Sequence, residues 1–295
     1  MTPEQRGSAE YAAFAGMSLI WGSTFLAIRF GNDTIPPLWG ATLRLLLAAP
    51  LLFVVARMSG VPFPKGHALR GAALFGFLNL GLNFSLLYWG EQRVASGIAA
   101  VLYATVPLTS GVFAWIFGLE RFQKTKLIGA VIGLAGVALI FAGELKLGAP
   151  EVALLAVFLG ATIAALSTIV LKRTPSQSPF MTNSVGALAG IPVCLLGSLL
   201  LHEAHPIPSG VKEWWPILYL VVAGNLGAYV LYAWLVSRWN VTTVSTTALI
   251  VPVLAVLLGS LVRGESPAPE TYLGGLVVLV GVTMALRVGK KVAPG

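Results

Sequence analysis

The chain has 295 residues, of which 57% are hydrophobic and only 10% are charged, and its formal net charge is +8. About a quarter of the residues of a soluble domain are charged, so the composition excludes a protein whose surface faces mainly water. The single cysteine, Cys194, excludes an intramolecular disulfide.

Ten apolar segments follow one another along the chain, and each reaches or approaches the roughly 20 apolar residues that a bilayer-spanning helix needs. They cover residues 11–30, 38–57, 69–89, 94–118, 127–142, 151–171, 180–201, 214–236, 241–262 and 272–288. Inside lipid, backbone polar groups must bond within their own segment, which requires helices for such spans. We therefore predict an all-α membrane protein with ten transmembrane helices.

The basic residues are unevenly distributed over the connecting loops. With the N-terminus placed in the cytoplasm, 13 of the 19 lysines and arginines lie on the cytoplasmic side, 5 lie on the opposite side, and Arg44 lies inside a span. This distribution follows the positive-inside rule and predicts cytoplasmic termini. We expect a multi-pass, monomeric protein of the cell inner (cytoplasmic) membrane. Its expected partners are the lipid bilayer and a small-molecule substrate, and we expect no binding to nucleic acid.

The second half of the chain repeats the first at an offset of about 145 residues. The match is carried by rare residue types, namely the pairs Trp89/Trp234, Arg93/Arg238, Pro107/Pro252 and Glu120/Glu265. The copies, predicted at residues 11–143 and 151–288, each hold an odd number of spans, so the second copy is inverted in the membrane. Two inverted five-helix repeats around a central cavity are typical of alternating-access transporters.

Several short motifs resemble one known family. The opening motifs are Trp21-Gly22-Ser23-Thr24-Phe25, Pro36-Pro37 and Leu43-Arg44-Leu45-Leu46-Leu47. The closing motifs are Pro107-Leu108 with Gly118-Leu119-Glu120-Arg121, repeated around Pro252 and Gly264-Glu265. Together they resemble the EamA-type branch of the drug/metabolite transporter superfamily over about residues 11–288. The resemblance implies ten helices, a central cavity between two five-helix halves, cytoplasmic termini and export of small metabolites, amino acids among them.

Arg44 is the one charged residue predicted at membrane depth, where an ionisable side chain indicates a functional site. Its guanidinium could attract a carboxylate or another anionic group of the substrate. Alternatively, it could extend outward toward the membrane surface or bond helix-end carbonyls in a structural role. We expect the side chain to face the protein interior rather than lipid.

Acidic residues are predicted only at span ends, in loops and in the N-terminal tail. Proton-coupled carriers commonly use a buried carboxylate, so the sequence favours facilitated export, exchange, or coupling through another group. Glu120 and Glu265 are expected to brace helix ends or loop arginines.

Neutral polar residues within the spans are the other candidates for substrate binding. Amides, hydroxyls and aromatic rings on common helix faces suit zwitterionic or amphipathic solutes. With Arg44, the predicted substrate-binding residues are Trp21, Ser23, Thr24, Asn79, Asn83, Tyr103, Asn225, Tyr229 and Thr246. The alternative is that these groups hydrogen-bond neighbouring helices.

Four prolines are predicted inside spans: Pro50, Pro107, Pro192 and Pro252. Proline removes a helical hydrogen bond and bends the helix. The paired kinks could act as hinges that close the two ends of the cavity in turn, or they could be static bends.

These features favour a secondary transporter that exports small metabolites by alternating access, with amino acids or related compounds as the substrates that the resemblance implies. A multidrug or other metabolite permease of the same fold is the alternative. An intramembrane enzyme is disfavoured because all three histidines, His67, His202 and His205, lie in loops. A channel is disfavoured because no ring of like charges is apparent. We therefore predict no catalytic residue, no metal and no cofactor.

Overall fold

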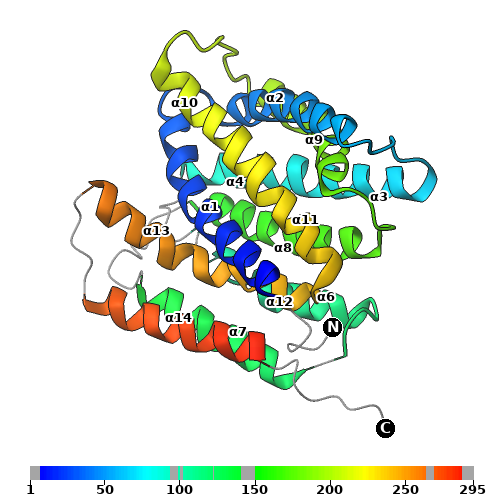
Figure 1. The fold of residues 1–295 in the computed structure, drawn as a ribbon. Coiled ribbons are helices and arrows are strands. Elements are labelled where there is room, and N and C mark those ends of the chain that lie inside the picture. The colour runs from blue at the N-terminus through cyan, green and yellow to red at the C-terminus, as the bar shows by residue number, and fades with distance from the viewer. Residues whose placement is uncertain are drawn as a thin grey trace.

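The computed structural model describes residues 7–93, 99, 102–121, 123–140, 150–263 and 269–287, and every regular element within them is helical (Figure 1). The first half contains α1 (Ser8–Asn32), α2 (Pro37–Met58), α3 (Gly66–Gly76), η2 (Phe77–Asn83), α4 (Phe84–Glu91), α6 (Val106–Ile116) and α7 (Lys124–Ile140). The second half contains α8 (Glu151–Arg173), α9 (Pro179–Leu200), α10 (Val211–Tyr219), η3 (Leu220–Tyr229), α11 (Val230–Arg238), α12 (Val241–Ser245), α13 (Thr247–Arg263) and α14 (Pro269–Arg287).

The predicted all-α class is confirmed. Six of the described helices are long and apolar enough to cross a membrane, with α3–η2–α4 and α10–η3–α11 each forming one continuous helix. Shorter apolar helical stretches cover Val106–Ile116, Val241–Leu254 and Tyr272–Met284. The count of ten spans and the cytoplasmic placement of the termini remain predictions.

Equivalent helices of the two halves lie side by side at opposite ends of the molecule. Helix α2 packs along α9, and α7 packs along α14 (Figure 1). In the second pair glycines bring the backbones together, since a Cβ atom on Gly136 would lie 2.8 Å from the Gly274 carbonyl oxygen, and one on Gly281 would lie 2.5 Å from that of Gly129. Small residues permit such close approach in membranes, so these glycines pack the two helices together.

The outer faces of these helices carry large apolar side chains, as lipid-facing surfaces do. Leu46 and Val54 on α2, Leu188 on α9 and Leu276 on α14 are all exposed. The inner faces of α1, α2, η2, α9, η3 and α11 form the largest buried apolar cluster.

The third helix of each half contains a π-helical stretch, η2 in the first and η3 in the second. The predicted repeat offset places residues 77–83 on residues 222–228, so the two stretches are equivalent. A π-helix widens the turn because each N–H bonds a carbonyl five residues back, and such stretches occur frequently at functional sites. Asn79 and Asn83 of η2 and Asn225 and Tyr229 of η3 all lie in the molecular interior.

Three of the predicted prolines lie inside helices: Pro50 in α2, Pro192 in α9 and Pro252 in α13. Pro107 differs, because the described part of the predicted 94–118 segment is interrupted by a turn at residues 104–105 and Pro107 lies in the first turn of α6. A proline in that position removes no intrahelical hydrogen bond.

The predicted bracing role of Glu120 is confirmed. Its carboxylate accepts hydrogen bonds from the Thr242 backbone N–H at 3.1 Å and from the Thr242 hydroxyl at 2.9 Å, at the start of α12, and it pairs with Lys126 at 3.1 Å. The equivalent Glu265 lies outside the described residues.

Candidate functional site

A cavity of about 130 Å³ lies between the two halves. Its walls come from α1, α2, η2, α4 and residues 102–106 of the first half, and from α8, η3, α11, α12 and α13 of the second. Seven of the ten predicted substrate-binding residues line it: Trp21, Thr24, Arg44, Asn79, Asn83, Tyr103 and Tyr229.

Arg44 lies on the cavity wall and is only 3% exposed, so the expectation that it faces the protein interior is confirmed. Its Nε donates a hydrogen bond to Asn225 Oδ1 at 2.6 Å, and its Nη1 donates to the Tyr88 hydroxyl at 3.1 Å. The guanidinium also lies 4.7 Å from the centre of the Phe84 ring. All these partners are neutral, and the ion pairs among the described residues, Lys126–Glu120 and Arg238–Glu10, lie elsewhere.

A glycine on η3 makes room for this guanidinium. A Cβ atom on Gly224 would lie 2.6 Å from Arg44 Nη2, so a larger residue there would displace the charge. In the other half Gly186 stands at the repeat position of Arg44, and it packs against Gly76 on α3. Close backbone packing thus replaces the cation in that half.

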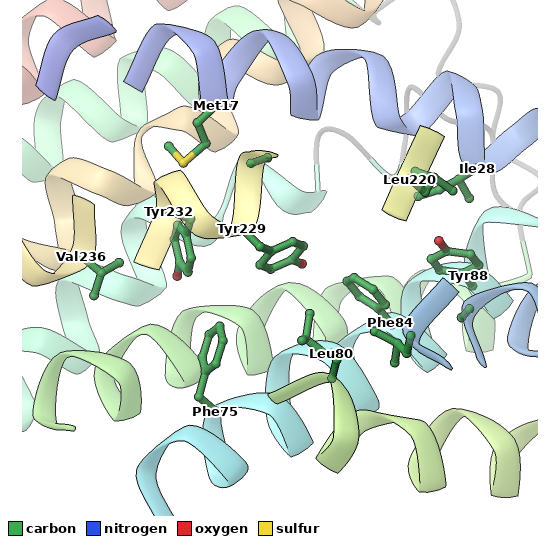
Figure 2. Close-up of a cluster of buried hydrophobic side chains, with 14 of the residues drawn as sticks. Met17, Ile28, Phe75, Leu80, Phe84, Tyr88, Leu220, Tyr229, Tyr232 and Val236 are labelled. Atoms are coloured by element: carbon green, nitrogen blue, oxygen red, sulfur yellow. The ribbon is translucent and has the colours of Figure 1, made fainter. Parts of the chain in front are cut away.

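Four aromatic rings form a row through the interior, from Tyr232 through Tyr229 and Phe84 to Tyr88 (Figure 2). The centroids of successive rings are 6.3, 5.8 and 5.8 Å apart. Trp21 packs against two of these rings, with centroids 5.6 Å from Tyr229 and 5.3 Å from Tyr232. The row ends at Arg44, so the cavity has an apolar aromatic part and a cationic end.

The asparagines of η2 are held by hydrogen bonds between the halves. Asn79 Nδ2 donates to the Ser167 hydroxyl at 2.5 Å, and Asn79 Oδ1 accepts from the Tyr229 hydroxyl at 3.1 Å. Asn83 Oδ1 accepts from the Tyr103 hydroxyl, and Asn83 Nδ2 donates to the Asn79 carbonyl at 3.1 Å. These amides therefore both face the cavity and connect α8, η3 and the residues before α6.

The remaining predicted binding residues lie beside the cavity rather than on its wall. Asn225 is behind Arg44 and orients it. Ser23 bonds the Tyr219 hydroxyl at 2.5 Å and donates to the Ile20 carbonyl at 2.6 Å. Thr246 donates to the Thr243 carbonyl at 2.7 Å, at the break between α12 and α13.

Sequence reasoning missed Phe84, Leu87 and Tyr88 as members of the cavity wall. The i, i+4 spacing from Asn83 could have identified Leu87. The π-helical turn η2, which precedes Phe84 and Tyr88, is not evident from residue periodicity. Ser245 and Thr247 also line the cavity, and the polar run around Thr246 was the available signal for them.

A second, larger hollow of about 420 Å³ lies between the start of α2 and the end of α4, on the side that the predicted topology places outside the cell. Asp33, Trp89, Arg93 and Glu203 are among its lining residues. Glu203 caps α2, since its carboxylate accepts from the Trp39 backbone N–H at 2.9 Å. Trp89 directly follows Tyr88 in the chain, which places this hollow next to the cationic end of the cavity.

Beyond Tyr232, the side chains at the end of α11 are closely packed. Trp239, 1% exposed, contacts the rings of Phe14 and Tyr11 at centroid distances of 5.4 and 5.5 Å. Lys172 Nζ donates to the carbonyls of Val236 and Trp239 at 2.7 and 2.9 Å, which binds α8 to the end of α11.

Comparison with known proteins identifies the family. A model of the EamA-like transporter family matches residues 9–142 and again residues 151–287. The chain belongs to the EamA-like transporter family. With the apolar helices described above, this membership makes it a multi-pass membrane transporter of the drug/metabolite transporter superfamily.

Relatives of this EamA-family transporter match it over nearly its whole length. The "Uncharacterized inner membrane transporter YedA" of Escherichia coli K12 is 31% identical over 96% of this chain and 92% of that protein. The "Probable terminal-alkyne amino-acid exporter" of Streptantibioticus cattleyicolor is 27% identical over 90% of each chain. A solved crystal structure with 20% identity superposes with a TM-score of 0.77 and covers 97% of this chain and 99% of its own, so it shares the fold. The transporter is a protein of the inner membrane.

Proposed function

We propose that this EamA-family transporter exports small carboxylate-bearing metabolites, amino acids or related compounds, across the cytoplasmic membrane. The observation that carries the proposal is Arg44, a buried guanidinium on a cavity wall whose described partners are neutral. A buried charge without an opposite charge is costly, and a carboxylate entering the cavity would supply that charge through short, charge-assisted hydrogen bonds.

The mechanism we propose is alternating access by one polypeptide. The cavity wall is built from both halves of a single chain, which supports a functional monomer. The close packing at Trp239 and the hollow near Arg93 suit a transporter that is open toward the outside and closed toward the cytoplasm. The change to a state open toward the cytoplasm would bend α2, α9 and α13 at Pro50, Pro192 and Pro252. It would also separate α6 from the turn before Pro107.

Transport by purified protein in liposomes tests the proposal. We expect uptake or counterflow of members of a panel of amino acids and their derivatives. Arg44→Gln should reduce the rate at low substrate concentration by about thirtyfold or more, because removing one partner of a buried charged pair costs about 2–5 kcal/mol. The matched control is Arg57→Gln at the exposed end of α2, which should transport normally. Transport of no carboxylate-bearing compound, or an active Arg44→Gln variant, would refute the proposal.

The same liposomes test the coupling. No described residue of the cavity wall is acidic, which supports facilitated transport or exchange. We therefore expect the rate to be insensitive to an imposed pH gradient. Strong acceleration by a proton gradient would require a coupling group outside this wall.

Cysteine labelling tests the inverted topology on two equivalent loops. Ser59 follows α2 and Ser209 precedes α10, and both are exposed. In cells that produce Ser59→Cys or Ser209→Cys, a membrane-impermeant thiol reagent should label only the second. The native Cys194 is buried and should not react. Labelling of both loops from the same side would contradict the inverted repeat.

A further inference from the structure

Hydrogen-bond donors without acceptors gather at the cationic end of the cavity. A guanidinium has five N–H donors and no acceptor, and the described residues accept two bonds from Arg44. Because Arg44 can only donate, Asn225 must present its Oδ1 to it, which turns Nδ2 the other way. Asn225 is fully buried, and its Nδ2 has no hydrogen-bond partner among the described residues. A carboxylate, which only accepts, complements this surplus of donors.

The side-chain amide oxygens of the cavity wall are already engaged. Asn79 Oδ1 accepts the hydroxyl of Tyr229, and Asn83 Oδ1 accepts that of Tyr103. The described wall residues include Arg44 as the sole charged side chain. A substrate ammonium, which only donates, would thus meet a nearby cation and no carboxylate on this wall.

The aromatic rings do not offer an evident alternative for an ammonium. A cation can lie over an aromatic face, but the guanidinium of Arg44 already lies over Phe84 at 4.7 Å. Trp21, Tyr229 and Tyr232 pack against one another in tilted and edge-to-face contacts. These rings therefore present apolar surface, which suits the hydrocarbon body of a substrate.

From these contacts we infer that the cavity selects monoanions: amphipathic carboxylates with an apolar or aromatic body and no charged amino group. N-acylated or deaminated relatives of amino acids fit this description, and zwitterionic amino acids fit it less well. The inference rests on the proposed function and specifies the substrate class of the same site. The carboxylate would lie at Arg44, which Asn225 holds in place from behind, and the body would lie along the ring row toward Tyr232.

Binding of four probes that share a phenylethyl body to the purified full-length protein tests this selection. The probes are 3-phenylpropionate and N-acetylphenylalanine as anions, phenylalanine as the zwitterion and phenethylamine as the cation. Binding is measured at pH 7 by thermal stabilisation and by fluorescence, since Trp21 lines the cavity. We expect the anions to bind at least about tenfold more tightly than phenylalanine and phenethylamine not to bind, because an ammonium that exchanges even one hydrogen bond to water for none in the cavity loses about that much.

Two variants link the preference to the site. Asn225→Asp keeps the size of the side chain and places a carboxylate beside Arg44, so it should fold and lose the preference for anions. Glu91→Gln removes a carboxylate three residues after Tyr88, and Glu91 itself is not among the described residues of the cavity wall. This second variant should leave the preference unchanged. A wild-type preference for anions that persists in Asn225→Asp, or disappears in Glu91→Gln, would overturn the inference.

The outcomes separate the inference from the proposed function. Phenylalanine binding as tightly as the anions would overturn the inference and leave carboxylate transport intact. Tightest binding of phenethylamine, or binding and transport of no carboxylate at all, would overturn both.

Discussion

Gly76→Ala is the substitution for which the structure gives the sharpest energetic expectation. A Cβ atom on Gly76 would lie 2.1 Å from both Cα and O of Gly186, whereas ordinary contacts begin at 3.4 Å, so α3 and α9 would have to separate by about 1.3 Å. The clashing atoms belong to the backbone and cannot rotate away. Overpacking costs about 1–3 kcal/mol, and a clash between backbone atoms lies at the upper end of that range. The better helix propensity of alanine recovers at most about 1 kcal/mol. We expect a net loss of about 2 kcal/mol.

The matched control is Gly275→Ala in the middle of α14. Its Cβ atom would lie 3.7 Å from Val253 Cγ1, an ordinary contact, so this variant should be as stable as the native protein or slightly more stable. Both variants are compared by thermal unfolding of purified protein, where about 2 kcal/mol corresponds to a melting temperature lower by about 4–8 °C. Equal melting temperatures for the two variants would refute the reasoning about the α3–α9 contact.

The remaining predictions concern one helix cap, one cavity hydroxyl and one proline. Glu120→Gln should lower stability by about 1–2 kcal/mol, because the charged cap on Thr242 is weakened; an unchanged melting temperature would contradict this role. Tyr103→Phe removes the hydroxyl that bonds Asn83, and should change the substrate dissociation constant by about tenfold or less; loss of the fold would indicate a structural role instead. Pro252→Ala should lower the maximal transport rate without changing substrate binding, because the kink acts as a hinge in the conformational change. An unchanged rate would indicate that the bend is static.

Hydropathy predicted the helices well because burial in lipid is a local property of the sequence. The predicted segment 180–201 corresponds to α9 at Pro179–Leu200, and the predicted segment 214–236 lies within the continuous α10–η3–α11 helix. Polar residues within apolar helices were equally informative. Asn79 and Asn83 stood out for that reason, and both line the cavity.

Predictions from helical spacing failed where the backbone departs from the regular α-helix. The π-helical η2 precedes Phe84 and Tyr88, and a spacing of 3.6 residues did not select them. The break at Thr246 turns that residue toward the Thr243 carbonyl, so its neighbours Ser245 and Thr247 line the cavity instead. Such departures depend on packing against other helices, which residue periodicity does not record.

By itself, the sequence determined that this is a helical membrane protein and that its halves repeat, and it predicted a single arginine at membrane depth. Each of these follows from residue type and local order along the chain. Only the tertiary structure decided what surrounds that arginine. Arg44 and Asn225 are 181 residues apart in the chain, and Gly224 leaves the space that the guanidinium fills. The polarity of the cavity arises from this contact between the halves, because the environment of a buried charge depends on its neighbours in space.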